Sequence, residues 1–171
     1  DRGRRRRAAS RVSTDTNVRR AGARDRAVLA RLLSDMQAHY GSPDPPGGAD
    51  EMARLLTREG ERLPFALLAE RDGTTLGFAT LTPVLFGGAY QWLLFLKDLY
   101  VAEQARGLGI GRALLLAMAR IAVDENYCRI DWTTDAANEG ARRLYDRLGV
   151  PRHDKPFYRL SGEDLRKFAA G

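Results

Sequence analysis

The sequence predicts an α/β (α+β) fold, in which a single mixed, mostly antiparallel, twisted sheet carries helices on both faces. Hydrophobic periodicity orders the elements as strand, two helices, three strands, helix, strand, helix and strand, with a last helix at the end. The segment after residue 90 reads as strand, helix, strand, which requires a parallel pair, while short turns allow antiparallel hairpins before it. The 171 residues suit one domain.

The first half of the chain is expected to form an edge strand, two helices and a hairpin. Apolar residues from Val28 to Met36 recur at helical spacing, and the sequence GSPDPPGG over 41–48 ends that helix. Arg71-Asp72-Gly73 predicts a hairpin turn. The expected elements are a strand over 16–20, helices over 25–40 and 50–58, and strands over 64–70 and 75–82.

The second half should contain a long strand followed by alternating helices and strands. Residues from Ile110 to Ile121 give a helix with a broad apolar face, and Cys128, Ile130, Trp132 and Thr134 share one face of a strand. Gly149 and Pro151 end the next helix. The expected elements are strands over 90–101, 128–134 and 157–160, and helices over 109–124, 138–148 and 162–169. A break is expected at Gly87-Gly88.

The net charge of +6 comes almost entirely from the first eleven residues, which hold six arginines and one aspartate. The rest of the chain has 22 basic and 21 acidic residues. We expect 1–14 to be a disordered basic tail, ahead of one domain over 15–171. A nearly neutral domain argues against nucleic acid as the main partner. No apolar run reaches membrane-spanning length, so no membrane partner is expected.

Arg106-Gly107-Leu108-Gly109-Ile110-Gly111 lies between an expected strand and helix. Glycines here leave backbone N–H groups unshielded at the positive end of the helix dipole, which is an anion site suited to a diphosphate. Arg106 and Arg112 add positive charge. The chain has no Gly-Lys-Ser or Gly-Lys-Thr, which excludes a P-loop, and the glycine spacing does not fit a Rossmann fingerprint.

The same loop resembles the acyl-CoA motif Q/R-x-x-G-x-G/A of the GNAT acetyltransferases through Arg106, Gly109 and Gly111. Residues 97–101 resemble the fourth strand of that family. Asn138, Tyr145 and the pair Leu148-Gly149 resemble its second signature. Residues 90–149 are similar without gaps to spermidine/spermine-type acetyltransferases and their bacterial relatives, whereas the first 60 residues match in layout alone.

The resemblance implies a GNAT-like sheet with splayed central parallel strands and a site for acetyl-CoA, with no metal. The strand over 98–101 would bulge, and backbone groups of Leu99 and Val101, beside Tyr100, would pair with the pantetheine arm. Asn138 would contact CoA, and Tyr145 would lie near the thioester sulfur. The diphosphate would lie on the N–H groups of Arg106, Gly107, Leu108, Gly109, Ile110, Gly111 and Arg112.

Acetyl transfer to an amine sets further requirements on the site. The amine must lose a proton to attack, an oxyanion needs a donor such as the Leu99 N–H, and the thiolate needs an acid. Spacing alone is consistent with Tyr145 as a packed residue of an amphipathic helix. With the family resemblance added, Tyr145 is the expected acid that protonates the thiolate. Asp98 either orients the amine and relays its proton or stabilises the bulge. Lys97 replaces the Glu of polyamine enzymes, which disfavours a polycation.

Other residues carry weaker predictions, each with a structural alternative. The acids could bind a cation or be solvated, the aromatic residues could line a pocket or belong to the core, and the histidines suggest surface or capping roles. Cys128 is expected to be a buried small residue, and a lone cysteine favours a reducing cytoplasm. The acids are Asp35, Asp44, Asp50 and Glu51; the aromatic residues are Tyr40, Phe86 and Trp92; the histidines are His39 and His153.

The sequence therefore predicts an acetyl-CoA-dependent N-acetyltransferase acting on a primary amine of a small molecule. Two alternatives stay open: a non-catalytic acyl-CoA-binding regulatory module, and acetylation of protein lysines or N-termini. The presence of Tyr145 argues for the enzyme. Dimers are common in the family, so the resemblance is compatible with a homodimer; the oligomeric state and the identity of the amine are left open.

Overall fold

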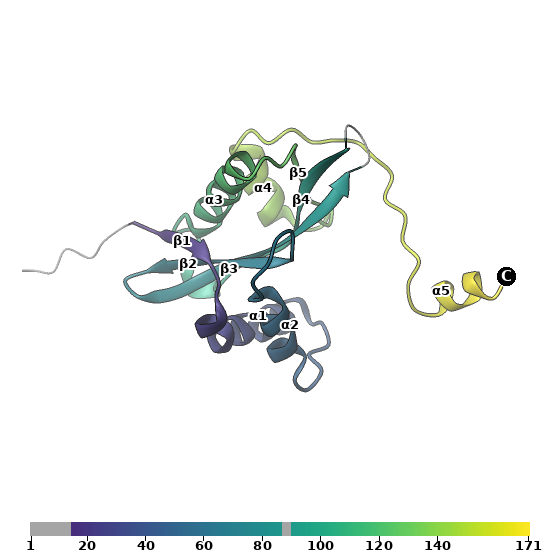
Figure 1. Ribbon diagram of the computed structural model, residues 1–171, viewed down its shortest axis with the longest axis horizontal. Helices are drawn as coiled ribbons and strands as arrows, with labels where there is room; N and C mark the ends of the chain where they lie inside the picture. The colour runs from purple at the N-terminus through teal and green to yellow at the C-terminus, as the bar shows by residue number, and fades with distance from the viewer. Residues whose placement is uncertain (1–14, 87–89) are drawn as a thin grey trace, which may run out of the picture. The chain divides into compact units, whose positions relative to one another are not determined.

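A computed structural model describes residues 15–86 and 90–171 of the chain (Figure 1). The predictions for the 1–14 tail and for the Gly87-Gly88 break lie outside these residues. The chain divides between Asp135 and Ala136 into two compact units. The first unit holds the sheet and the helices packed on it, and the second holds the last two helices.

The first unit is built on a five-stranded sheet in the order β1-β2-β3-β4-β5. Neighbouring strands are antiparallel from β1 to β4, and β4 and β5 are parallel. The mixed, mostly antiparallel sheet predicted from the sequence is confirmed, with its parallel pair at one end of the sheet. The strands are β1 (Asn17–Arg20), β2 (Phe65–Arg71), β3 (Thr74–Phe86), β4 (Gln91–Val101) and β5 (Ile130–Asp131).

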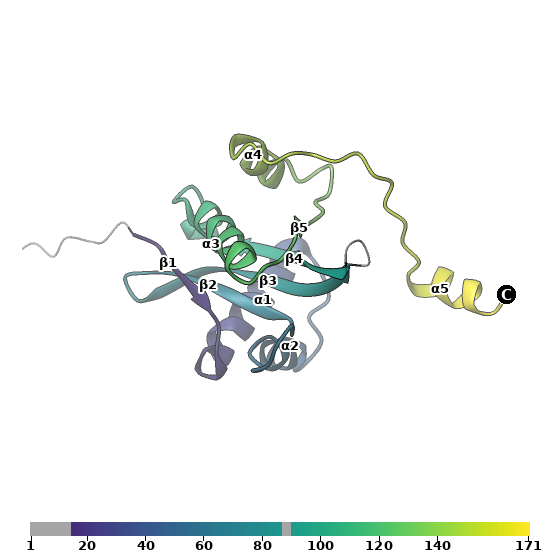
Figure 2. The ribbon, with the colours of Figure 1, turned by 45° about the horizontal axis from the view of Figure 1, so that its top comes forward.

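Helices cover both faces of this sheet, as predicted (Figures 1 and 2). On one face lie α1 (Arg26–Tyr40) and α2 (Gly48–Leu56), and on the other lies α3 (Ile110–Asp124). Side chains alternate along each strand, so each face of the sheet contributes its own set to the core. The cluster beneath α1 and α2 contains Leu29, Leu32, Leu33, Met36, Leu56, Leu68, Phe78 and Tyr100.

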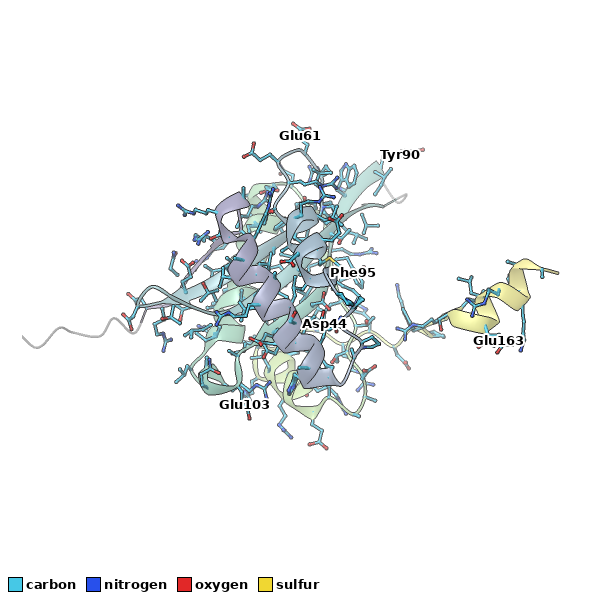
Figure 3. The ribbon with its side chains drawn as sticks, turned by 90° about the horizontal axis from the view of Figure 1, so that it is seen from below. Asp44, Glu61, Tyr90, Phe95, Glu103 and Glu163 are labelled. Carbon is cyan, nitrogen blue, oxygen red and sulfur yellow. The ribbon has the colours of Figure 1, made fainter. Side chains whose placement is uncertain are left out.

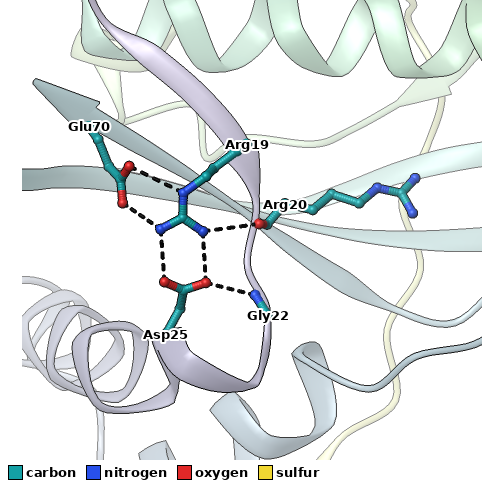
Figure 4. A network of polar contacts seen from close by, with 5 residues as sticks. All are labelled: Arg19, Arg20, Gly22, Asp25 and Glu70. Carbon is teal, nitrogen blue, oxygen red and sulfur yellow. Dashed lines mark hydrogen bonds and ion pairs between the residues drawn. The ribbon is translucent and has the colours of Figure 1, made fainter.

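A partly buried network of charges fixes the junction between β1 and α1 (Figure 4). The Arg19 guanidinium donates to both oxygens of Asp25, each at 2.8 Å, and to Glu70 at 2.6 and 3.2 Å. The Gly22 N–H also donates to Asp25, at 2.8 Å. This network ties the start of α1 to β2, and so sets the position of α1 across the sheet.

The turn between β2 and β3 follows directly from local sequence. Asp72 and Gly73 both have positive φ, at 50° and 75°, which is the backbone of a tight two-residue hairpin turn. The turn predicted there is confirmed. The strand predicted over 75–82 continues through Pro83 to Phe86, because β3 pairs with β4 as far as Phe86 and Gln91.

The β5 region differs from its prediction. The strand expected over 128–134 is only Ile130–Asp131, and it pairs with Leu94 and Phe95. Cys128 is exposed, which corrects the expectation of a buried residue. The Cys128 N–H donates to the Trp92 carbonyl at 2.8 Å, so the chain already runs beside β4 there without forming a regular ladder.

The second unit contains α4 (Glu139–Arg147) and α5 (Gly162–Ala169), and both helices agree with the predicted ranges within about two residues. The strand predicted over 157–160 is wrong, because these residues form no strand. Phe157 is 66% exposed and Tyr158 is 89% exposed. A short alternating pattern specifies a strand only where a neighbouring edge pairs with it.

Candidate active site

The glycine loop begins where β4 ends. A 3-10 turn, Glu103–Ala105, reverses the chain, and α3 starts at Ile110 with Gly109 as its N-cap. Gly107 and Gly109 have φ of 79° and 81°. Residues with a Cβ adopt this left-handed backbone conformation only at a cost in free energy. A Cβ at either position would meet no atom within 4 Å, so both glycines face open space.

The loop presents a row of unpaired backbone donors. Among the hydrogen bonds of residues 15–86 and 90–171, none is donated by the N–H groups of five loop residues. Unpaired N–H groups at a helix N-terminus, with the helix dipole behind them, form a binding site for an anion such as a diphosphate. The five are Gly107, Gly109, Ile110, Gly111 and Arg112.

The Arg106 side chain connects the loop to β4 and to α1. Its Nε donates to the Val101 carbonyl at 3.3 Å, and its Nη2 lies 3.2 Å from Nε2 of His39, in α1. The guanidinium is therefore bonded to the end of β4 and to α1. Arg112, by contrast, is exposed. The unpaired donors of the loop are therefore backbone N–H groups, and the Arg106 side chain is a brace between the loop, β4 and α1.

A cleft of about 420 Å³ lies beside this brace. Tyr100 lines it, and burial, reinforced by the Asp35 carboxylate, raises the pKa of its hydroxyl above the ordinary value. The Tyr100 ring also lies 6.2 Å from the His39 ring. The cleft is lined by Asp35 and Arg31 from α1 and by Glu103 and Arg106 from the loop, together with neighbouring residues. Glu103 is labelled in Figure 3.

The last residues of β4 have a free edge on the side away from β3. The ladder between β4 and β5 covers only Leu94 and Phe95 of β4. The Ala102 N–H donates to the Leu76 carbonyl of β3 at 2.9 Å. Because backbone direction alternates along a strand, Leu99 and Val101 direct their N–H and C=O groups to the other side, away from β3. The Val101 carbonyl on that side accepts the bond from Arg106.

A β-bulge in β4 lies three residues before this edge ends. The pairing shifts between Thr80 and Leu81, so Thr80 opposes Asp98, Leu81 opposes Leu96, and Lys97 is the extra residue. The Thr80 hydroxyl donates to Oδ2 of Asp98 at 2.6 Å, and the Asp98 N–H donates to the same hydroxyl at 3.1 Å. Lys97 Nζ lies 3.4 Å from the other Asp98 oxygen, Oδ1.

Comparison with known proteins identifies the family of the chain. The model of the acetyltransferase (GNAT) family matches residues 29–150. The chain belongs to the GNAT acetyltransferase family. It is 29% identical over 133 residues to the uncharacterized N-acetyltransferase YhfO of Bacillus subtilis, an alignment covering 78% of this chain and 88% of YhfO.

Two further relatives agree with this family. The D-amino-acid N-acetyltransferase HPA3 of Saccharomyces cerevisiae is 31% identical over 140 residues, covering 81% of this chain and 86% of HPA3. The integron cassette protein VCH_CASS6 from the mobile metagenome of Vibrio cholerae is 27% identical, with a TM-score of 0.72, covering 91% of this chain and 98% of that structure. The family match and these relatives make this chain a member of an N-acetyltransferase family. Enzymes of the GNAT family use acetyl-CoA as a cosubstrate.

The second signature of the GNAT resemblance lies in α4. Asn138 is the N-cap of this helix, and its side-chain oxygen accepts from the Ala141 N–H at 3.2 Å. Tyr145 lies seven residues further along and is half-buried. Both residues belong to the second unit. The Asn138 side chain thus has a capping role in α4.

Several of the remaining candidate residues form ion pairs or ring contacts within the domain. Glu51 is paired with Arg54, at 2.6 Å, and Asp44 and Asp50 are exposed. Trp92 lies under the Arg62 guanidinium, 5.4 Å from ring centre to Cζ. Tyr40 packs edge-on against His39, with ring centres 4.9 Å apart. These contacts favour structural roles for Glu51, Trp92 and Tyr40 in the GNAT domain.

Two residues that contact the candidate site are absent from the site residues predicted from the sequence. Thr80 holds Asp98, and Arg71 donates to the Leu108 carbonyl in the middle of the glycine loop, at 3.0 Å. Each residue is distant in sequence from its partner, so no local sequence motif indicates the contact. Within the described ranges, no group of three His, Cys, Asp or Glu residues could hold a metal, and no helix has the length and apolar character to cross a membrane.

Proposed function

We propose that the domain over 15–171 is an acetyl-CoA-dependent N-acetyltransferase that acts on a primary amine of a small molecule. The observation that carries this proposal is the junction of two features at one end of β4. The unpaired N–H groups of the glycine loop suit the diphosphate of CoA, and the free edge at Leu99 and Val101 suits its pantetheine arm.

The cofactor would bind as an added strand. The pantetheine amides would pair with the C=O of Leu99 and with the N–H of Val101, beside Tyr100, while the diphosphate lies on the loop from Arg106 to Arg112. Its thioester would then lie near the bulge at Asp98, because pantetheine extends away from the diphosphate along β4. Asn138 would add a polar contact through its amide nitrogen.

Reaction requires a neutral amine next to the thioester carbonyl. An alkylammonium has a pKa of about 10.4, so removing its proton at pH 7 costs roughly 4–5 kcal/mol. Asp98 is suited to accept or relay this proton through water, because only its Oδ2 is held by Thr80 and its side chain is 26% exposed. The amine nitrogen then bonds to the carbonyl carbon.

The tetrahedral intermediate has to be stabilised and then collapse. The Leu99 N–H, on the free edge, is the proposed donor to its oxyanion. Collapse breaks the bond between carbon and sulfur, the nitrogen gives its second proton to water so that the amide is neutral, and the thiolate takes a proton from the Tyr145 hydroxyl. Bulk water restores that proton. The chemistry is therefore direct transfer in a ternary complex, with one amide formed and one thiol released.

Lys97 and the relatives both bear on the class of amine. The Lys97 side chain is 69% exposed at the bulge, so a positive charge stands beside the proposed acceptor position. That charge disfavours a polyamine and favours an amine that also carries a carboxylate. HPA3, which is named for acetylation of D-amino acids, has an acceptor of this kind. We infer that small amino acids belong among the first acceptors to test.

A thiol-release assay with acetyl-CoA tests the proposal across amino acids, polyamines, aminoglycosides and peptides. We expect turnover on at least one small amine, with the acetylated product identified by mass spectrometry. Binding of acetyl-CoA without turnover on any amine would instead indicate a non-catalytic acyl-CoA-binding module. Turnover restricted to peptides would indicate acetylation of protein lysines or N-termini.

A further inference from the structure

Arg71, the last residue of β2, reaches the glycine loop from the sheet. Its Nη2 donates to the Leu108 carbonyl at 3.0 Å and to the Thr16 hydroxyl at 2.9 Å, just before β1. Its Nε is buried and has no hydrogen-bond partner among the described residues. A buried donor without a partner is costly, so Arg71 occupies this place at some expense to stability.

The bond to Leu108 controls the direction of a loop amide. The Leu108 carbonyl and the Gly109 N–H belong to the same planar peptide unit, and in a trans peptide these two groups point in opposite directions. No cis peptide occurs among the described residues. Because Arg71 holds the carbonyl on one side, the Gly109 N–H is directed to the other side. There it donates to no described residue.

We propose that Arg71 is a positioning residue for the diphosphate of the cofactor. By holding the Leu108 carbonyl, it orients the Gly109 N–H toward the bound anion, and its guanidinium places a fixed positive charge beside the loop. The role rests on the function proposed above, since it requires that the loop holds a diphosphate. Thr16 is the second anchor, which prevents the long Arg71 side chain from rotating away.

The binding of CoA and of pantetheine, which lacks the diphosphate, separates this role from a purely structural one. We expect Arg71→Gln to raise the Kd of CoA about tenfold, the typical loss for one charge-assisted hydrogen bond at a site. The Kd of pantetheine should stay within about twofold of wild type. Arg71→Lys keeps the charge but lacks the planar fork, so it should restore part of the affinity. Calorimetry measures CoA, and competition measures pantetheine.

Arg62 offers a matched control at the other end of the sheet. It too has a buried nitrogen without a partner, Nη1, and its guanidinium lies 4.5 Å from the Tyr127 ring centre. Figure 3 shows Glu61, the residue before it, and Glu103 at opposite ends of the first unit. Arg62→Gln should lower the melting temperature, as should Arg71→Gln, and should leave the Kd of CoA unchanged.

The outcomes distinguish the two proposals. If wild type binds CoA and Arg71→Gln binds it equally well, or if that variant loses CoA and pantetheine affinity by the same factor, Arg71 does not position the loop. If Arg71→Gln does not fold, Arg71→Lys decides between the same outcomes. If wild type binds CoA no better than pantetheine, the loop is not a diphosphate site, and the proposed function fails together with the role of Arg71.

Discussion

The hydroxyl of Thr80 donates a 2.6 Å hydrogen bond to the Asp98 carboxylate and accepts one of 3.1 Å from the Asp98 N–H. These two bonds close the β-bulge at Lys97, where β4 turns its free edge toward the proposed pantetheine site. The bulge and the candidate base are thus one structural unit. Variants at the two positions should separate the structural part of this unit from its chemistry.

Asp98→Asn and Thr80→Val should affect different measurements. The asparagine can still accept from Thr80 but cannot take a proton, so we expect kcat to fall by about 10²-fold or more with little loss of stability. Thr80→Val removes both bonds, and should lower the free energy of unfolding by about 1–3 kcal/mol. Urea denaturation and steady-state kinetics test these effects. An unchanged kcat in Asp98→Asn would leave Asp98 a purely structural acid.

Tyr145→Phe should lower kcat much more than it changes the affinity for acetyl-CoA. The substitution removes one hydroxyl, and the departing thiolate loses its proposed proton donor. Tyr158→Phe is the matched control, because Tyr158 is 89% exposed and should tolerate the change. Steady-state kinetics with calorimetric binding separates the two effects. A Tyr145→Phe enzyme with wild-type kcat would remove this tyrosine from the acid role.

Gly109→Val should abolish cofactor binding while the domain stays folded. Nothing lies within 4 Å of a Cβ at this position, so the new side chain would stand in the open space above the loop amides. The left-handed φ of 81° adds a strain of about 1–2 kcal/mol. Gly47→Val controls for that strain, because Gly47 has a φ of 74° and also faces open space. We expect this variant to bind CoA normally, as measured by calorimetry.

The ion pair between Arg19 and Asp25 should make stability depend on pH in the acid range. Hydrogen bonding by Arg19 lowers the pKa of Asp25 from 3.8 to about 2. A folded pKa below the unfolded value stabilises the protein above pH 4, and this stabilisation is lost as the pH falls toward 2. The lowering corresponds to roughly 2 kcal/mol at neutral pH.

Asp25→Asn should therefore cost roughly 2 kcal/mol at pH 7, and the difference from wild type should shrink steadily between pH 4 and pH 2. Urea denaturation at pH 7, 4 and 2.5 measures it. The nearby Glu70 remains bonded to Arg19 in this variant, which keeps the guanidinium paired. A difference of the same size at all three pH values would show that Asp25 contributes through packing rather than through its charge.

The parts of the structure that follow from the sequence are those specified by neighbouring residues. The glycine spacing from Gly107 to Gly111 indicated both the start of α3 and its exposed amides, because only local backbone geometry is involved. The Asp72-Gly73 turn and the amphipathic helices are predictable for the same reason. The bulge near Asp98 came from the family resemblance, and the shift in register at Lys97 confirms it.

The remaining features depend on contacts between distant residues. Arg71 and Leu108 are 37 residues apart, and Thr80 and Asp98 are 18 apart, so neither contact is visible in any motif. Arg106 and His39 are 67 residues apart, so the contact between their side chains is equally invisible in any motif. The strand expected over 157–160 depended on a partner edge, which its own sequence does not specify.

The central claim is that the backbone N–H groups at the start of α3 bind the diphosphate of CoA. The most direct test is an NMR titration of the ¹⁵N-labelled protein with CoA and, separately, with pantetheine. We expect the amide signals of Gly107, Gly109 and Gly111 to shift strongly with CoA and much less with pantetheine. Saturation with CoA that leaves these three signals in place, while others shift, would contradict it.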